Sequence, residues 1–280
     1  MHPVRFEALD GYSLGATMHR PKAPSGVGVV IHAAAGVPQE YYAKFAAYLA
    51  ERGFTTLTFD YRGIGASRPP NLRGFEARMR DWATLDCAAA LDFLRREVPD
   101  ARISVVGHSF GGQCLALVPG FERYASVLAV ASQSGYWRHW SGIGRAGMWL
   151  ATHLVLPGAS NLLGYFPARR LGQGEDLPAG VATEWARWCR HPGYIVGALG
   201  EEARYARFRA PLRLVWMADD RYAPRAAANA LLGFYPSAAT ELHEVHPAAL
   251  GVRKIGHFGF FRERFRATLW KDAADWLAEQ

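Results

Sequence analysis

The chain has 280 residues, half of them hydrophobic, which suffices for one large α/β domain or for one domain with an insertion. Its formal charge of +7 comes from basic residues scattered along the chain, which argues against a nucleic-acid-binding tract. The first residues lack a signal-peptide pattern, and no apolar run approaches the roughly 18 residues of a membrane span. We therefore expect a cytoplasmic protein without a membrane span.

The first half of the chain predicts a sheet. Residues 4–9 and 13–19 alternate in the manner of strands around Asp10-Gly11, which is typical of an antiparallel hairpin. Continuous apolar runs then alternate with helical patterns, and such runs describe strands that are buried on both faces of a mostly parallel sheet. We expect strands at 27–31, 55–59, 103–106 and 125–131, and helices at 41–52, at 80–97 and after Ser109.

The alternation stops between about Gly135 and Gly200 and then resumes with a strand at 212–217, a helix at 224–232, a strand at 240–245 and a final helix at 261–277. We therefore expect residues 1–134 and 201–280 to form an α/β core, and residues 135–200 to form an inserted helical cap. The insertion carries five of the nine tryptophans. Trp185 and Trp188 can share one helix face, which either binds a partly apolar substrate or packs the cap against the core.

The three cysteines, Cys87, Cys114 and Cys189, are an odd number without C-x-x-C spacing. This pattern argues against a disulfide framework and against a structural zinc site. We interpret all three as buried or incidental thiols and expect no metal.

The segment Gly107-His108-Ser109-Phe110-Gly111 lies where an apolar run meets a helical pattern. A G-x-S-x-G sequence at such a turn places the serine in a strained conformation, and glycines on either side avoid collisions with the neighbouring chain. Ser109 is therefore the candidate nucleophile, and the backbone N–H of Phe110 is a candidate oxyanion donor. The small residues after the strand at 27–31 offer a second donor, for which we prefer Ala34 and keep Ala35 as the alternative.

A serine hydroxyl needs a base, and the base needs an acid that orients it. Asp219 and Asp220 both follow the strand at 212–217, and we prefer Asp220 as the acid and expect Asp219 to cap the helix near Pro224. Nearly all of the ten histidines are dismissed by position. The best candidate for the base is His257, in a glycine-flanked loop between the last strand and the last helix.

Four motifs together resemble the α/β-hydrolase superfamily over nearly the whole chain: residues 32–36, residues 60–67, residues 107–112, and the loops of Asp220 and His257. Residues 60–67 look like the D-x-R-G-x-G-x-S loop of serine-aminopeptidase-like and monoglyceride-lipase-like hydrolases, in which the loop shapes the backbone beside the site. The resemblance implies an α/β-hydrolase fold and the triad order Ser109, Asp220, His257. This sequence departs from the family at the position before the nucleophile, where it has His108 in place of a helix-forming residue.

The residues and the resemblance together predict a serine hydrolase that acts on a small-molecule ester or related acyl compound through an acyl-enzyme intermediate. No metal or organic cofactor is expected. Two alternatives stay open, namely an acyltransferase that uses the same triad, and a binding protein built on an inactive hydrolase fold.

Overall fold

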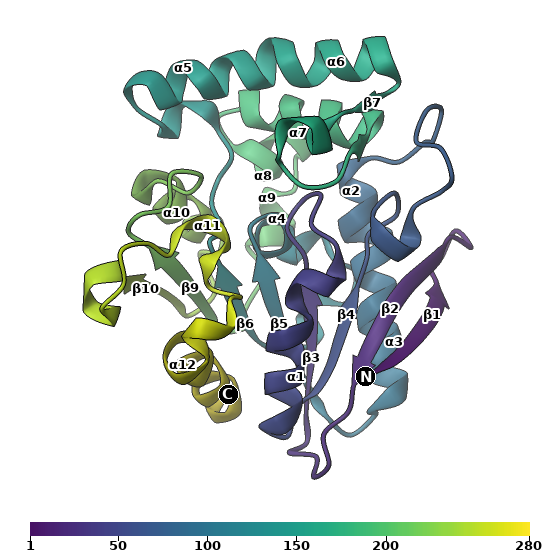
Figure 1. Ribbon diagram of the computed structural model, residues 1–280, viewed down its shortest axis with the longest axis vertical. Coiled ribbons are helices and arrows are strands. Elements are labelled where there is room, and N and C mark those ends of the chain that lie inside the picture. The colour runs from purple at the N-terminus through teal and green to yellow at the C-terminus, as the bar shows by residue number, and fades with distance from the viewer.

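The computed structural model describes all 280 residues, and an eight-stranded sheet runs through its middle (Figure 1). The strand order is β1-β2-β4-β3-β5-β6-β9-β10. β1 and β2 form an antiparallel hairpin, β2 also runs antiparallel to β4, and all other neighbours are parallel. The strands are β1 (His2–Glu7), β2 (Ser13–His19), β3 (Val27–His32), β4 (Thr55–Phe59), β5 (Arg102–His108), β6 (Tyr124–Val130), β9 (Leu212–Met217) and β10 (Thr240–Val245).

Helices lie on both faces of this sheet, with α1 and α12 in front of it and α3 behind it in Figure 1. The helices are α1 (Ala43–Glu51), α2 (Met79–Asp81), α3 (Ala88–Glu97), α4 (Phe110–Gln113), α5 (Gly142–Leu150), α6 (Leu156–Leu163), α7 (Ala179–Arg190), α8 (Tyr194–Leu199), α9 (Glu202–Tyr205), α10 (Arg225–Leu232), α11 (Gly256–Gly259) and α12 (Lys271–Glu279). None of them combines the length and the apolar character that crossing a bilayer requires.

The predicted mostly parallel sheet with an antiparallel hairpin at its start is confirmed. Every residue of β3 and β4 is buried, and so is all of β5 except Arg102, which agrees with the continuous apolar runs of these strands. The end of the chain differs from the prediction. The expected helix at 261–277 is divided, because wider π-type turns occupy Arg266–Trp270 and α12 begins only at Lys271.

Between β6 and β9 the chain forms α5, α6, α7, α8 and α9, and the short hairpin of β7 (Tyr165–Phe166) and β8 (Leu177–Pro178). Figure 1 shows α5, α6 and α7 lying across the carboxyl ends of the central strands. In a parallel sheet this edge is where the loops that carry reacting groups converge. The division of the chain into a core and a cap stays a prediction, and residues 135–200 are called the inserted segment below.

Candidate active site

Ser109 occupies the sharp turn between β5 and α4, with a backbone φ of +50° and ψ of −112°. A Cβ atom on Gly107 would lie 2.6 Å from the carbonyl group of Gly111, and one on Gly111 would lie 2.2 Å from the carbonyl oxygen of His32. Both contacts are too short for any side chain, so the two glycines allow the turn for the reason that the sequence suggested. The N–H of Ser109 donates to the carbonyl oxygen of Val130 at 2.9 Å, which holds the strained residue against β6.

His257 lies in α11, and its Nδ1 is 2.7 Å from Oδ2 of Asp220. Both side chains are buried. The other carboxylate oxygen of Asp220 accepts the backbone N–H of Tyr222 at 2.8 Å. A carboxylate bound to Nδ1 fixes the tautomer in which Nε2 is free to take a proton. Of the two neighbouring aspartates, Asp220 is therefore the one that can orient the histidine.

Asp219 has a different role from the one expected. Its two carboxylate oxygens accept the backbone N–H groups of Ile255 and Gly256, at 2.9 and 3.0 Å. It does not cap the helix near Pro224, since α10 has no side-chain cap. Asp219 instead accepts hydrogen bonds from the backbone N–H groups at the start of α11, which have no partner within that helix. It thereby holds the segment that carries His257.

Ser109 and His257 line one cavity of about 650 Å³, together with Phe110, Ala34 and Ala35. Most of its remaining lining is apolar or aromatic and includes Met79, Phe166, Leu177, Tyr222 and Phe258. Mostly apolar walls with a few polar groups are typical of small-molecule sites. The structure thus brings the predicted nucleophile and base to the same cavity.

The two tryptophans predicted to bind substrate do not share an environment. Trp185 is half-buried in α7 and lines the cavity. Trp188, one turn further along α7, is completely buried and lies outside the cavity lining. Its ring packs edge-on against Tyr194, with 6.4 Å between ring centroids. The prediction for Trp188 is wrong. Side chains three residues apart on an α-helix point in directions that differ by about 60°, and here that difference directs Trp185 to the cavity and Trp188 into the core.

The predicted oxyanion donor Ala34 is also corrected. Its backbone N–H donates to the hydroxyl of Tyr42 at 2.8 Å, and Tyr42 is buried. This amide is therefore already satisfied by an interior group. The backbone N–H groups of Ala35 and Phe110 make no hydrogen bond within the protein, and both residues line the cavity. The alternative, Ala35, becomes the better candidate for the second donor.

His108, next to the nucleophile, is locked into a hydrogen-bond chain that sequence analysis did not find. Its Nε2 lies 2.9 Å from the carbonyl oxygen of His257, and its Nδ1 lies 2.9 Å from the hydroxyl of Tyr42. A carbonyl only accepts, so Nε2 carries the proton and Nδ1 accepts from Tyr42. Burial holds the pKa of His108 well below its ordinary value. His108 is thus a neutral link between the nucleophile turn, the Ala34 loop and the His257 segment.

The loop of residues 60–67 is structural, as the sequence suggested. Asp60 is buried and accepts the backbone N–H groups of Gln39 and Ala66 at 2.7 and 2.9 Å. Arg62 binds the carboxylates of Asp86 and Asp10. Neither Asp60 nor Arg62 lines the cavity, so neither is in a position to meet a substrate there.

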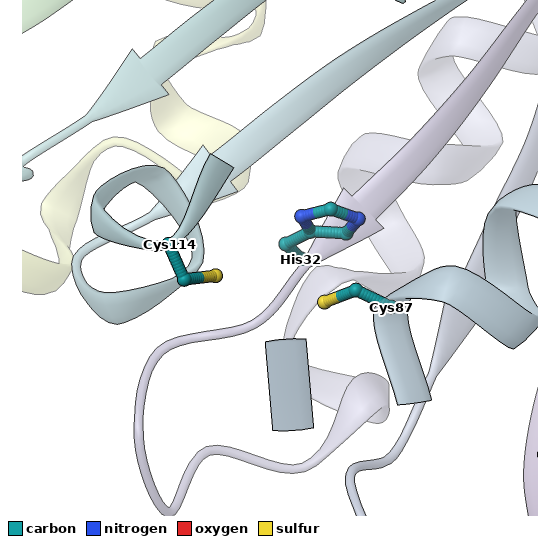
Figure 2. Close-up of side chains that lie close together, drawn as sticks. All are labelled: His32, Cys87 and Cys114. Carbon is teal, nitrogen blue, oxygen red and sulfur yellow. The ribbon is translucent and has the colours of Figure 1, made fainter. Parts of the chain in front are cut away.

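A further group of potential ligands lies in the core below the site. Figure 2 shows His32, Cys87 and Cys114 close together, and their ligand atoms lie within 4.8 Å of one another. All three cysteines of the chain are buried, as predicted. Burial lowers the pKa of His32 to about 4 and raises the pKa of Cys87 well above its ordinary value. A metal needs thiolates and, in a structural zinc site, four ligands, so we assign this group to core packing.

The model of a family described as the alpha/beta hydrolase family matches residues 29–268. An uncharacterized protein of Pseudomonas aeruginosa is 34% identical over 134 residues, a match that covers 45% of this chain and only 35% of that protein.

Two solved structures are similar over nearly their full length. The esterase domain of a Rhodothermus marinus protein superposes with a TM-score of 0.64 at 17% identity, covering 99% of this chain and 98% of that one. The monoacylglycerol lipase of Paleococcus ferrophilus superposes with a TM-score of 0.62 at 14% identity, covering 95% and 98%. At these identities the likeness shows a shared fold.

Proposed function

Because the chain belongs to the alpha/beta hydrolase family, we propose that it is a serine hydrolase that cleaves a carboxylic ester or related acyl compound. The observation that carries this proposal is the Asp220–His257 hydrogen bond of 2.7 Å at a cavity that is also lined by Ser109. A buried carboxylate, an oriented imidazole and a serine on a strained turn are the parts that acyl transfer requires. The narrower resemblance of residues 60–67 to one branch of the family stays a prediction.

The proposed reaction has two steps. His257 takes the proton of the Ser109 hydroxyl as its oxygen attacks the acyl carbon, and the N–H groups of Phe110 and Ala35 stabilise the oxyanion. His257 then gives that proton to the departing alcohol, which leaves an acyl group on Ser109. Water attacks the acyl-enzyme, His257 accepts a proton from the water, and the proton returns to Ser109 as the acid departs. Asp220 orients His257 and stabilises its charged form throughout.

The test is a series of p-nitrophenyl esters from acetate to dodecanoate, measured with the wild type and with Ser109→Ala. We expect turnover of at least part of the series and a loss of about a millionfold in kcat for the variant, as in a comparable triad. An unchanged rate in Ser109→Ala would overturn the proposal. Adding a primary alcohol and measuring the ratio of free acid to new ester separates hydrolysis from acyl transfer, and absence of turnover across varied acyl compounds would favour an inactive binding protein.

A further inference from the structure

A chain of four polar side chains runs from the inserted segment to the cavity. The indole N–H of Trp185 in α7 lies 3.0 Å from the hydroxyl oxygen of Tyr194 in α8. That hydroxyl lies 2.7 Å from Oε1 of Gln113 in α4. Nε2 of Gln113 lies 3.2 Å from Oε1 of Gln133, which follows β6. The chain therefore connects α7 and α8 of the inserted segment with α4 and with the residues that follow β6.

The direction of every hydrogen bond in this chain is fixed by its first member. An indole N–H can only donate, so the Tyr194 hydroxyl accepts from Trp185 and is left to donate its own proton to Gln113. Gln113 must then present its carbonyl oxygen to Tyr194 and its NH₂ group to Gln133. Gln133 accepts through its oxygen. The group of Gln133 that remains free is its NH₂, a hydrogen-bond donor.

This free donor opens into the cavity. Gln133 lines the cavity together with Ser109 and His257. Its Nε2 donates no hydrogen bond within the protein, and this atom is not fully enclosed by the protein. The residue as a whole is 6% exposed. A small exposed surface that ends in the cavity is what a substrate-facing amide would show.

The backbone around this chain is strained. The non-glycine residues with a positive φ are Ser109, Ala131 and Tyr194. Ala131 lies two residues before Gln133, and Tyr194 is itself a member of the chain. A Cβ atom on Gly135 would lie 2.5 Å from the Tyr194 ring, so the glycine leaves space for that ring. Strain of this kind persists where the surrounding structure enforces a particular arrangement, and it gathers at functional sites.

The charges of the cavity restrict what Gln133 can bind. Its lining contains no lysine or arginine, and Glu40 is its one acidic residue. The lining therefore offers no lysine or arginine to compensate the charge of an anionic group. A neutral oxygen, such as that of a ketone, ester, amide or ether, would instead accept a hydrogen bond from the free NH₂ group of Gln133.

We propose that Gln133 is a specificity-determining residue that selects substrates with a neutral oxygen acceptor in addition to the bond that is cleaved. This inference rests on the proposed function, since it assigns a substrate class to the same cavity. Trp185 and Tyr194 act as positioning residues, because they set which end of the Gln133 amide faces the substrate.

The experiment compares matched ester pairs that differ in one carbonyl group. The pairs are p-nitrophenyl 4-oxopentanoate against pentanoate, p-nitrophenyl 5-oxohexanoate against hexanoate, and 2-oxopropyl butanoate against propyl butanoate. The measured quantity is the ratio of kcat/KM within each pair, and the change of this ratio between enzymes cancels the intrinsic reactivity of the esters. We expect Gln133→Leu to lower the ratio about tenfold for at least one pair, as loss of one hydrogen bond would do.

Two further variants keep the test decisive. Gln133→Glu keeps an oxygen that accepts from Gln113 but replaces the NH₂ donor with a second carboxylate oxygen. This variant should therefore lose the preference for the ester with the additional carbonyl group, even if Gln133→Leu folds poorly. Tyr194→Phe frees the two amides to turn and should lower the ratio about threefold, since a reversed amide presents an acceptor. Ratios that stay at the wild-type value for all pairs in the Gln133 variants would overturn the proposal, and an unchanged ratio in Tyr194→Phe would overturn the positioning role.

Labelling by a fluorophosphonate distinguishes this inference from the proposed function. If the wild type and the Gln133 variants are labelled at equal rates while the ratios do not change, the inference fails and the serine hydrolase remains. If the wild type is not labelled at all, the proposed function itself fails.

Discussion

The carboxyl edge of the sheet and the inserted segment above it are held in different ways. At the sheet edge, hydrogen bonds fix the polar groups, with Asp220 on His257 and Asp219 on the amides that precede it. In the inserted segment, α5 buries no residue at all, and Ile143 and Leu162 are 93% and 83% exposed. The hydrogen bonds on Asp219, Asp220 and His257 thus come from the core itself, whereas α5 contributes no buried side chain. Substitutions in the two regions should therefore have different effects.

The largest effect should come from Asp220→Asn at the sheet edge. Asparagine keeps the shape but cannot stabilise a charged His257, and it favours the wrong tautomer. We expect kcat to fall about ten-thousandfold with little change in the melting temperature. Steady-state kinetics on the best p-nitrophenyl ester measures it, and a loss below tenfold would show that Asp220 is not the acid.

Trp188 and Trp185 test the inserted segment. Trp188→Ala removes a completely buried ring and should lower the free energy of unfolding by about 3–5 kcal/mol, with similar losses of activity for all esters. Trp185→Ala removes part of the cavity wall and should raise KM for long acyl chains more than for acetate. Denaturant titration and a chain-length series measure the two effects, and identical behaviour of both variants would contradict the separation that the structure shows.

Asp219→Asn should have a smaller effect on the chemistry than Asp220→Asn. The substitution replaces one of two accepting oxygens with an NH₂ group that faces a backbone N–H. Losing a charge-assisted hydrogen bond of this kind costs about 2 kcal/mol of stability, and we expect roughly tenfold lower kcat because the His257 segment is less firmly held. An effect on kcat as large as that of Asp220→Asn would mean that the roles of the two aspartates have been exchanged.

The smallest effect concerns pH and lies far from the cavity. His19 on β2 is buried without a partner for either ring nitrogen, and burial lowers its pKa from 6.5 to about 4. As the pH falls, His19 is therefore protonated in the unfolded chain before it is protonated in the folded protein. The free energy of unfolding consequently decreases as the pH falls from about 6.5 toward 4. His19→Leu should remove about 1 kcal/mol of this loss per pH unit. Urea titrations at pH 7 and pH 5 measure it, and an equal difference between variant and wild type at both pH values would contradict the shift.

Much of the fold was predictable from the sequence, and so was the turn at Ser109. The central strands are continuous apolar runs, and the collisions avoided by Gly107 and Gly111 follow from the geometry of a sharp turn. The choice of Ala35 over Ala34 was not predictable, because it depends on where the Tyr42 hydroxyl lies. The separation of Trp185 from Trp188 depends on how α7 is rotated over the core. The chain from Trp185 to Gln133 depends on contacts between the inserted segment, α4 and the residues after β6. Neither leaves a periodic pattern in the sequence.

The measurement that tests the central claim most directly is the mass of the protein after reaction with a fluorophosphonate, followed by peptide mapping. Only a serine that is activated by a base reacts rapidly with this reagent. We expect one adduct per chain, located on Ser109, with labelling abolished in Ser109→Ala and slowed strongly in Asp220→Asn. An adduct on another serine, or equal labelling of the wild type and Ser109→Ala, would contradict the assignment of Ser109 as the nucleophile.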